Sequence, residues 1–320
     1  MKQNLNYLNL FAAAIFSIVL QGCGEIHATK ESPDSSATSV IKKIESATDV
    51  ATQYVEIDGR KLAYRSIGNG KPFILCNRYR GMLDTWDPAF IDSLAKNYRV
   101  IIFDYSGFGL STGAPATDMT SFAKDIKDLA TALDFKTSVV GGWSFGGLVA
   151  QTFIAQYPQL VSHGVLIGTG PPGKNSVPIE PIFFERSSIL NNTLEDETIL
   201  FFEPAWEASR KAARLSHERI AKRTMTDRDI VIPEMLWGNY HKAFADCVED
   251  KRGIRDKVMT SKVPMLVVSG DHDISFPVQN WYALVRKLQS TQIIVIPMTG
   301  HGPQHEYPEL VARYISDFTQ

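Results

Sequence analysis

The chain has 320 residues, of which 44% are hydrophobic and 21% are charged, so it is long enough to bury a full-sized core. Its formal net charge of -2 at pH 7 gives no electrostatic reason to bind nucleic acid. The composition predicts a soluble, globular protein of the size of an enzyme.

The first 22 residues differ from the rest of the chain. A single lysine, Lys2, precedes the almost wholly apolar stretch from Leu10 to Leu20, which is too short to cross a bilayer of roughly 30 Å as a helix. Residues 1–22 are therefore predicted to be a signal peptide, which places the mature protein outside the cytoplasm.

The four residues from Leu20 to Cys23 resemble the lipobox of bacterial lipoproteins, an aliphatic residue, a spacer, a small residue and a cysteine. The resemblance implies that Cys23 is lipidated, becomes the mature N-terminus and anchors the protein in a membrane. Gly24 follows in place of aspartate, which favours the outer membrane by the sorting rule of enteric bacteria. An ordinary secretory signal with a chance cysteine is the alternative.

Residues 23–51 are rich in serine, threonine, lysine and glutamate and have few apolar side chains. Such a segment cannot bury enough surface to fold, so it predicts a flexible tether before a folded domain at 52–320. Within that domain, Cys76 and Cys247 are predicted to be free, buried thiols rather than a disulfide. No metal-ligand spacing is present in the sequence, and no metal or other cofactor is expected.

From Thr52 onward, apolar runs alternate with helical patterns. Two alternating runs around Asp58-Gly59 predict a β-hairpin. Buried strands are expected at 72–76, 99–104, 138–142, 163–170, 264–270 and 292–297. Helices are expected between most of them, for example at 122–133 and 278–288. The pattern predicts an α/β fold with an eight-stranded, mainly parallel sheet flanked by helices.

Residues of about 173–262 interrupt this alternation with two aromatic-rich, helix-like stretches. An insertion at this place lies over the ends of the strands, where ligands bind in open α/β folds, so the segment is predicted to be a helical cap. Most of its aromatic residues are expected to pack a helical core, and only a few to touch a substrate. These residues are Phe183, Phe184, Phe201, Phe202, Trp206 and Trp237.

Residues 139–151, VVGGWSFGGLVAQ, place four glycines within three positions of Ser144. A β-branched run precedes the serine and a helical pattern follows it, so Ser144 lies where a strand turns into a helix. In that context, residues 142–146 match the G-x-S-x-G pattern of a nucleophile elbow. The glycines would allow Ser144 a strained backbone conformation that exposes its hydroxyl.

These motifs, over about residues 52–320, resemble the α/β-hydrolase superfamily and its capped branch of esterases, C–C hydrolases and haloperoxidase-like enzymes. The resemblance implies a catalytic triad in the order Ser, Asp, His, because a serine hydroxyl needs a base. The family pattern G-x-x-D-x-x-x-P selects Asp273 as the acid, and the glycine-flanked His301 is the better match for the base. Asp271 and His305 are the alternates.

The resemblance also implies two amide donors for an oxyanion hole, Phe145 after the nucleophile and Tyr79 in the loop after strand 72–76. This loop departs from the family pattern. Asn77 and Arg78 stand where the family has His-Gly, and Arg80 replaces a proline. Because Arg78 replaces a glycine, the backbone geometry of the oxyanion hole is an open question.

Arg78 and Arg80 allow two interpretations. One of them could clamp an anionic group of the substrate. Alternatively, both could pair with loop carboxylates such as Asp84 or Asp87. Trp143, inside the elbow, is a further candidate for contact with the substrate.

The sequence therefore predicts a serine hydrolase that acts on a carboxylic ester or related acyl compound through an acyl-enzyme. It does not separate a carboxylesterase from a C–C hydrolase, a thioesterase or a perhydrolase, and it does not predict the oligomeric state. The alternative from another class is a lipid-anchored binding module that kept the fold without turnover. The expected partners are a small-molecule acyl substrate and, through the anchor, a membrane.

Overall fold

The structure is a computed structural model that describes residues 45–223 and 225–320. The predicted signal peptide, the predicted lipidation site Cys23 and most of the predicted tether lie outside the described residues. Among the helices that are described, none combines the length and the hydropathy that crossing a membrane requires.

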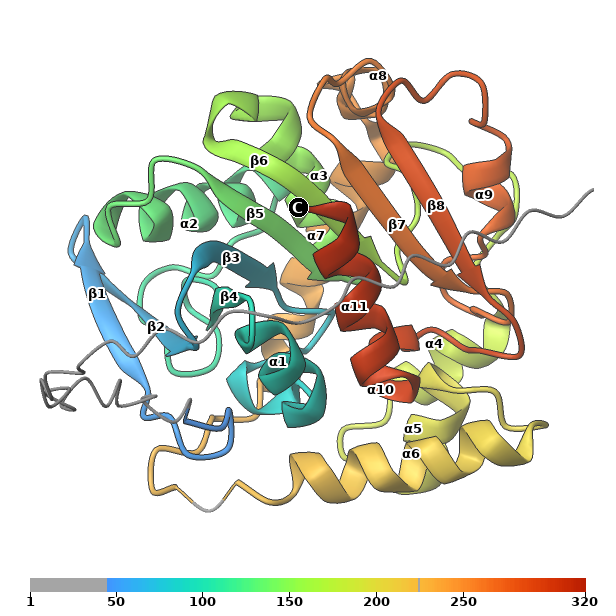
Figure 1. Cartoon of the computed structure of the whole chain (residues 1–320), viewed down its shortest axis with the longest axis horizontal. Helices are drawn as coiled ribbons and strands as arrows, with labels where there is room; N and C mark the ends of the chain where they lie inside the picture. Colours follow the sequence, from blue (N-terminus) through green and yellow to red (C-terminus); the bar gives the residue numbers. More distant parts are fainter. Residues whose placement is uncertain (1–44, 224) are drawn as a thin grey trace, which may run out of the picture. The chain divides into compact units, whose positions relative to one another are not determined.

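An eight-stranded sheet forms the centre of the fold (Figure 1). Its strands in chain order are β1 Gln53–Ile57, β2 Arg60–Ile67, β3 Lys71–Cys76, β4 Tyr98–Phe103, β5 Ser138–Trp143, β6 Val161–Ile167, β7 Met265–Gly270 and β8 Thr291–Ile296. They are ordered β1-β2-β4-β3-β5-β6-β7-β8 across the sheet. The β1–β2 and β2–β4 pairs are antiparallel and the other pairs are parallel. The predicted mainly parallel α/β sheet is confirmed.

The hairpin predicted at Asp58-Gly59 joins β1 to β2, with Ile57 opposite Arg60. Both turn residues have positive φ, 49° for Asp58 and 76° for Gly59. Two-residue hairpin loops favour this backbone because its twist matches that of the strands. The predicted hairpin is therefore present, and the structure places its first strand, β1, at an edge of the sheet.

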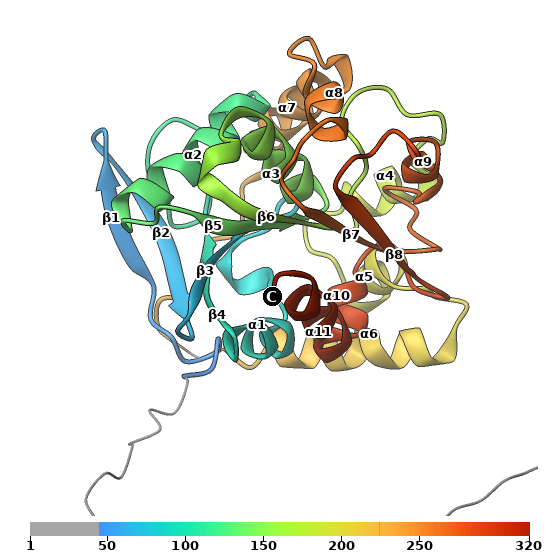
Figure 2. The same cartoon turned by 45° about the horizontal axis from the view of Figure 1, so that its top comes forward.

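Helices cover both faces of the sheet. The helices outside the predicted cap are α1 Pro88–Ala95, α2 Met119–Ala132, α3 Phe145–Gln156, α9 Gln279–Tyr282, α10 Pro303–Glu306 and α11 Pro308–Phe318. Figure 2 shows α2 and α3 on one face and α1 and α11 on the other. Short 3-10 helices also occur at η1 Leu83–Thr85, η2 Pro158–Leu160 and η3 Glu234–Leu236.

The chain between β6 and β7 is helical, as α4 Pro181–Ser187, α5 Leu194–Phe201, α6 Glu207–Ile220, α7 Trp237–Glu249 and α8 Ile254–Met259. These helices form two groups. Helices α4, α5 and α6 contact one another in sequence, and α6 also packs on α10 and α1. Helix α7 contacts α2, and α8 contacts α3, so they lie on the other side of the sheet (Figure 2).

Two predicted elements are shorter than expected. The helix expected at 278–288 ends at Tyr282 and continues as turns, and Arg286 has a φ of 79° that a right-handed helix cannot accommodate. The strand expected at 163–170 ends at Ile167, because Gly168 follows with a φ of 46°. The left-handed Gly168 thus directly follows the strand, whereas Arg286 lies four residues beyond the end of α9 and excludes a helix that runs to 288.

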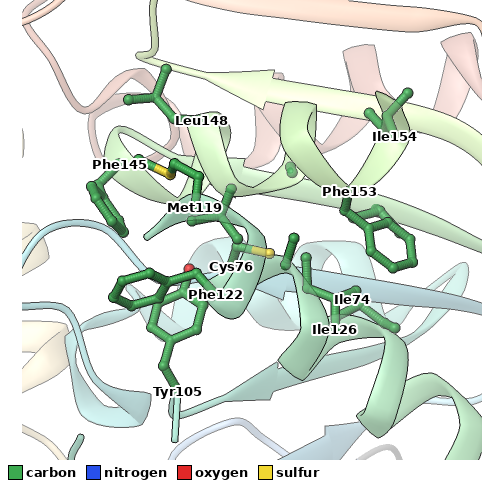
Figure 3. Packing of buried hydrophobic residues seen from close by; sticks show 14 of the residues in the cluster. Ile74, Cys76, Tyr105, Met119, Phe122, Ile126, Phe145, Leu148, Phe153 and Ile154 are labelled. Carbon is green, nitrogen blue, oxygen red and sulfur yellow. The ribbon is translucent and has the colours of Figure 1, made fainter. Parts of the chain in front are cut away.

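The core beside α2 and α3 holds the end of β3 and the elbow segment together. Ile74, Cys76, Phe122, Phe145 and Phe153 belong to one buried cluster on this side of the sheet (Figure 3). Helix α3 is buried on nearly all of its sides, which explains why it lacks a polar stripe. The turn between β5 and α3 therefore stands on rigid, closely packed elements.

The cysteines and the N-terminal segment complete the core. Cys76 and Cys247 are both buried and free, as predicted.

The fold extends to the N-terminal side of the predicted boundary at residue 52, because the Ala47 amide donates to Asp92 Oδ1 at 2.7 Å. The Val50 carbonyl accepts from Arg223 Nη1 at 3.0 Å.

Candidate active site

Ser144 lies between β5 and α3 with φ 60° and ψ -123°, a strained conformation for a residue other than glycine. Its amide donates to the Ile167 carbonyl at 2.9 Å, which ties the turn to β6. A Cβ atom on Gly142 would lie 2.2 Å from the Gly146 carbonyl oxygen, and one on Gly146 would lie 2.1 Å from that of Cys76. Only glycine fits at these two positions, so the local sequence dictates the sharp turn.

Asp273 and His301 form a buried pair. His301 Nδ1 lies 2.9 Å from Asp273 Oδ2 and 3.0 Å from Oδ1, and the side chains are 1% and 0% exposed. The carboxylate also accepts from the amides of Ser275 and Phe276, each at 2.8 Å from Oδ1. These contacts orient the carboxylate toward the imidazole. His301 and Ser144 line the same cavity.

The two alternates lie in other surroundings. Asp271 is exposed, and its Oδ1 lies 2.7 Å from Nδ1 of His272. His305 is buried, its Nδ1 lies 3.2 Å from Ser216 Oγ, and its ring packs at 4.5 Å from that of Trp143. Burial lowers the pKa of His305 to about 4, so this imidazole is neutral at physiological pH. Neither alternate lines the cavities at the serine.

Two cavities meet at Ser144. The first, here called the apolar cavity, has a volume of about 370 Å³ and is lined mainly by aromatic side chains, including Phe183, Phe184, Tyr240, Phe244 and Phe276. The second, here called the polar cavity, has a volume of about 270 Å³ and is lined by Arg78, Arg80, Glu197, Phe201 and His301 among others. A molecule that reacts at Ser144 can thus place chemically different groups on its two sides.

Three of the six cap aromatics reach these cavities: Phe183, Phe184 and Phe201. Phe202 and Trp237 are buried elsewhere, and Trp206 is half-exposed. Two of the six therefore pack the fold, three line the cavities at the serine, and Trp206 does neither.

The two predicted oxyanion donors, Phe145 and Tyr79, both line the apolar cavity with the serine. Within the described part of the chain, neither of their amides donates a hydrogen bond. Asn77, which stands where the family has histidine, anchors the loop that carries Tyr79. Its Nδ2 donates to the Phe103 carbonyl at 2.7 Å, and its Oδ1 accepts from Trp86 Nε1 at 2.6 Å.

Arg80 has a structural role, because its guanidinium binds backbone carbonyls. Its Nη1 donates to the carbonyls of Ser187 at 2.7 Å and Ile189 at 2.8 Å. Its guanidinium carbon lies 3.8 Å from the centroid of the Trp237 ring. Arg80 therefore connects the loop to the end of α4, and its guanidinium is occupied by backbone oxygens rather than free to clamp a substrate.

The alternative pairing of the loop arginines with Asp84 or Asp87 is wrong. Asp84 Oδ1 lies 2.6 Å from Arg65 Nη1, and Asp87 Oδ2 lies 2.5 Å from Arg219 Nη2. Both partners come from other elements, β2 and α6, so these carboxylates are already neutralised. The environment of Arg78 is different and is described below.

Trp143 lines neither cavity. It is buried, and its Nε1 donates to the carbonyl oxygen of His301 at 2.8 Å. The indole packs instead against the rings of Phe201 and His305, so the predicted contact of Trp143 with the substrate is not seen.

Glu197 and His241 are among the polar cavity residues that the sequence analysis did not identify. Glu197 lines the polar cavity from α5. His241 lines the apolar cavity from α7, with Nε2 3.3 Å from the hydroxyl of Tyr79. Both lie in cap helices without a recognisable motif, so the sequence contains no local signal for them.

Comparison with known proteins agrees with this architecture. The family model described as "alpha/beta hydrolase fold" matches residues 71–308. A non-heme haloperoxidase of Rhodococcus erythropolis is 26% identical over 260 residues, which cover 77% of this chain and 90% of that protein. Lipase 1 of Psychrobacter immobilis is 25% identical over 310 residues, which cover 92% and 91%.

A solved structure, the alpha/beta hydrolase fold protein from Chitinophaga pinensis, superposes with a TM-score of 0.76 at 27% identity. The match covers 86% of this chain and 98% of that one. Together with the sheet order and the strained serine after β5, these matches show that the chain belongs to the α/β hydrolase fold family.

Proposed function

We propose that the protein is a serine hydrolase that acts on a carboxylic ester or a related acyl compound. One arrangement carries this proposal. Ser144, in its strained turn, shares a cavity with His301, and the Nδ1 of that histidine is held by the buried Asp273. A hydroxyl, an imidazole and an orienting carboxylate are the three parts that activate a serine for attack.

In the proposed reaction, Ser144 Oγ attacks the substrate carbonyl while His301 Nε2 accepts its proton. Asp273 holds the proton on Nδ1 and stabilises the imidazolium. The amides of Phe145 and Tyr79 stabilise the negative charge that develops on the carbonyl oxygen. The imidazolium then protonates the leaving group, and water attacks the acyl-enzyme by the same steps to release the acid.

The size of the cavities supports a small to medium substrate. The apolar cavity has room for an alkyl or aryl group, and its aromatic wall favours such a group over a polar one. The relative named Lipase 1 supports hydrolysis of an ester bond. The relative named as a haloperoxidase keeps perhydrolysis as the second candidate reaction for the same serine.

Labelling with a fluorophosphonate probe tests the function. The wild-type chain should react covalently and Ser144→Ala should not, and the probe should block hydrolysis of short nitrophenyl esters. Perhydrolase activity is then measured with acetate and hydrogen peroxide. Absence of labelling in a folded wild-type protein would overturn the proposal and leave the binding module as the better interpretation.

We also propose that the mature protein is a lipoprotein held on the outside of a membrane by Cys23. The support is the pattern from Leu20 to Cys23 after the apolar stretch. The described fold begins at residue 45, so residues 23–44 separate the proposed anchor from the first described residue.

A further inference from the structure

Arg78 is held beside the proposed nucleophile by two aromatic rings. Its guanidinium carbon lies 5.3 Å from the ring centroid of Trp143 and 4.8 Å from that of Phe201. The side chain lines the polar cavity together with Ser144 and His301. Cation–π contacts of this kind fix a guanidinium without consuming its N–H donors.

Arg78 forms no ion pair within the described part of the chain. Nη1 donates to the Tyr79 carbonyl at 2.8 Å, whereas Nε is buried and has no hydrogen-bond partner in the described part of the chain. No aspartate or glutamate among the described residues comes within 4.0 Å of the guanidinium nitrogens. A buried cation without a counterion is costly, so its retention calls for an external anion.

Burial, with a smaller effect of Arg80, lowers the pKa of Arg78 to about 10. The guanidinium therefore remains charged at physiological pH, although its surroundings favour the neutral form. An anion bound in the cavity would reverse this effect.

Glu197 lines the same cavity as Arg78, so it is the candidate counterion within the protein. Its Oε2 is however engaged with Nδ1 of His217 at 2.8 Å. The wall of the polar cavity then carries two arginines against one glutamate, which leaves a net positive charge. That balance suits a monoanion and disfavours a dianion such as a phosphate monoester.

We propose that Arg78 forms a carboxylate-binding subsite, so that the preferred substrate is an acyl compound with an apolar group on one side of the scissile carbonyl and a carboxylate on the other. This inference rests on the proposed function. The flat fork of the guanidinium matches the two oxygens of a carboxylate, and a partly desolvated pair of this kind is strong. The apolar cavity receives the opposite end of the same molecule.

Matched pairs of nitrophenyl esters test the subsite. In one arm the acyl chain ends in a carboxylate or in its methyl ester. In the other arm the carboxylate or its methyl ester is on the leaving phenol. The quantity measured is the ratio of kcat/KM for the charged ester to kcat/KM for its neutral partner, which cancels any general loss of activity.

For wild type the ratio should exceed one in at least one arm, and Arg78→Gln should lower it by about tenfold to a hundredfold. Arg78→Lys, which keeps the charge but not the fork, should lower it less. Arg210→Gln removes an exposed arginine of α6 that lines neither cavity, so this matched control should leave the ratio unchanged.

An unchanged ratio in Arg78→Gln, with hydrolysis of the neutral esters intact, would overturn the subsite and leave the proposed function standing. Loss of probe labelling in wild type would instead overturn the function itself. If Arg78→Gln does not fold, the wild-type ratio decides, and a ratio of one or less in both arms would also overturn the subsite.

Discussion

Trp143 Nε1 donates a hydrogen bond of 2.8 Å to the carbonyl oxygen of His301. The two residues are 158 positions apart in the chain. Trp143 precedes the nucleophile, and His301 is the proposed base. The bond therefore links the elbow turn to the loop that must bring the imidazole to the serine.

Trp143→Phe removes this donor and keeps an aromatic ring. Because the loop of His301 then loses a fixed contact, kcat for a nitrophenyl ester should fall by about tenfold while KM changes little. Trp281→Phe is the matched control. It removes a similar buried bond, from Trp281 Nε1 to the Thr169 carbonyl at 2.6 Å, but it lies in neither cavity. Equal losses of kcat in both variants would contradict a positioning role.

Removal of any proposed triad member should nearly abolish hydrolysis. Ser144→Ala, Asp273→Asn and His301→Ala should each lower kcat/KM by about 10³ or more, and the effects should not add in double variants. Steady-state kinetics with circular dichroism as a folding control measures this. Asp271→Asn changes an exposed carboxylate two positions away and should have little effect. A severe loss of activity in that control would show that Asp271, and not Asp273, is the acid of the triad.

Gly146→Ala should prevent the elbow from forming. The added Cβ would lie 2.1 Å from the Cys76 carbonyl oxygen, so β3 and α3 would have to separate, and the free energy of unfolding should fall by about 3 kcal/mol. Gly238→Ala, in α7, meets no heavy atom within 4 Å and should stabilise the chain by about 0.5–1 kcal/mol. Urea unfolding compares the two, and similar behaviour of both variants would contradict the steric argument.

Glu306 should make stability depend on pH. Burial raises the pKa of this carboxyl to about 7 from an ordinary value of 4.5. The folded state therefore favours the protonated form, and its stability should fall as pH rises from about 4.5 to about 7 and then level off. Glu306→Gln should be more stable than wild type at pH 8 by about 1–2 kcal/mol and should gain nothing at pH 4.

The urea midpoints of wild type and Glu306→Gln, measured at both pH values, check this prediction. Glu309→Gln provides the control, because Glu309 is exposed on the neighbouring helix α11. It should leave the pH dependence of the midpoint unchanged. A gain for Glu306→Gln that is equal at both pH values would show that ionisation of this carboxyl is not its cause.

Cys23→Ser should release the protein from the membrane. If Cys23 carries the proposed lipid, the wild-type chain should partition into detergent, and the variant should appear in the soluble extracytoplasmic fraction. Mass spectrometry of the mature N-terminus is the direct measurement. Cleavage at another residue without an acyl mass would refute the lipoprotein proposal.

The α/β architecture and the elbow could be predicted from local patterns in the chain. Strand and helix periodicities are local properties of the chain, and they predicted the eight-stranded sheet with its hairpin at Asp58-Gly59. The steric demand for glycine at Gly142 arises within the turn itself, whereas that at Gly146 comes from the Cys76 carbonyl at the end of β3. The G-x-S-x-G pattern between a strand and a helix was nevertheless enough to predict the place of Ser144 from a short segment. The choice of Asp273 and His301 came from family spacing, and the structure brings these two side chains together.

The roles of the side chains around Ser144 could not be predicted in this way, because they depend on how distant elements pack. Arg80 binds carbonyls more than a hundred positions away in the cap. Arg78, two positions earlier, instead contacts the rings of Trp143 and Phe201 and forms no ion pair in the described part of the chain. The sequence could not distinguish these two arginines, because their partners come from distant elements. Burial, charge compensation and cavity shape depend on how those elements pack, and no local pattern in the chain records that packing.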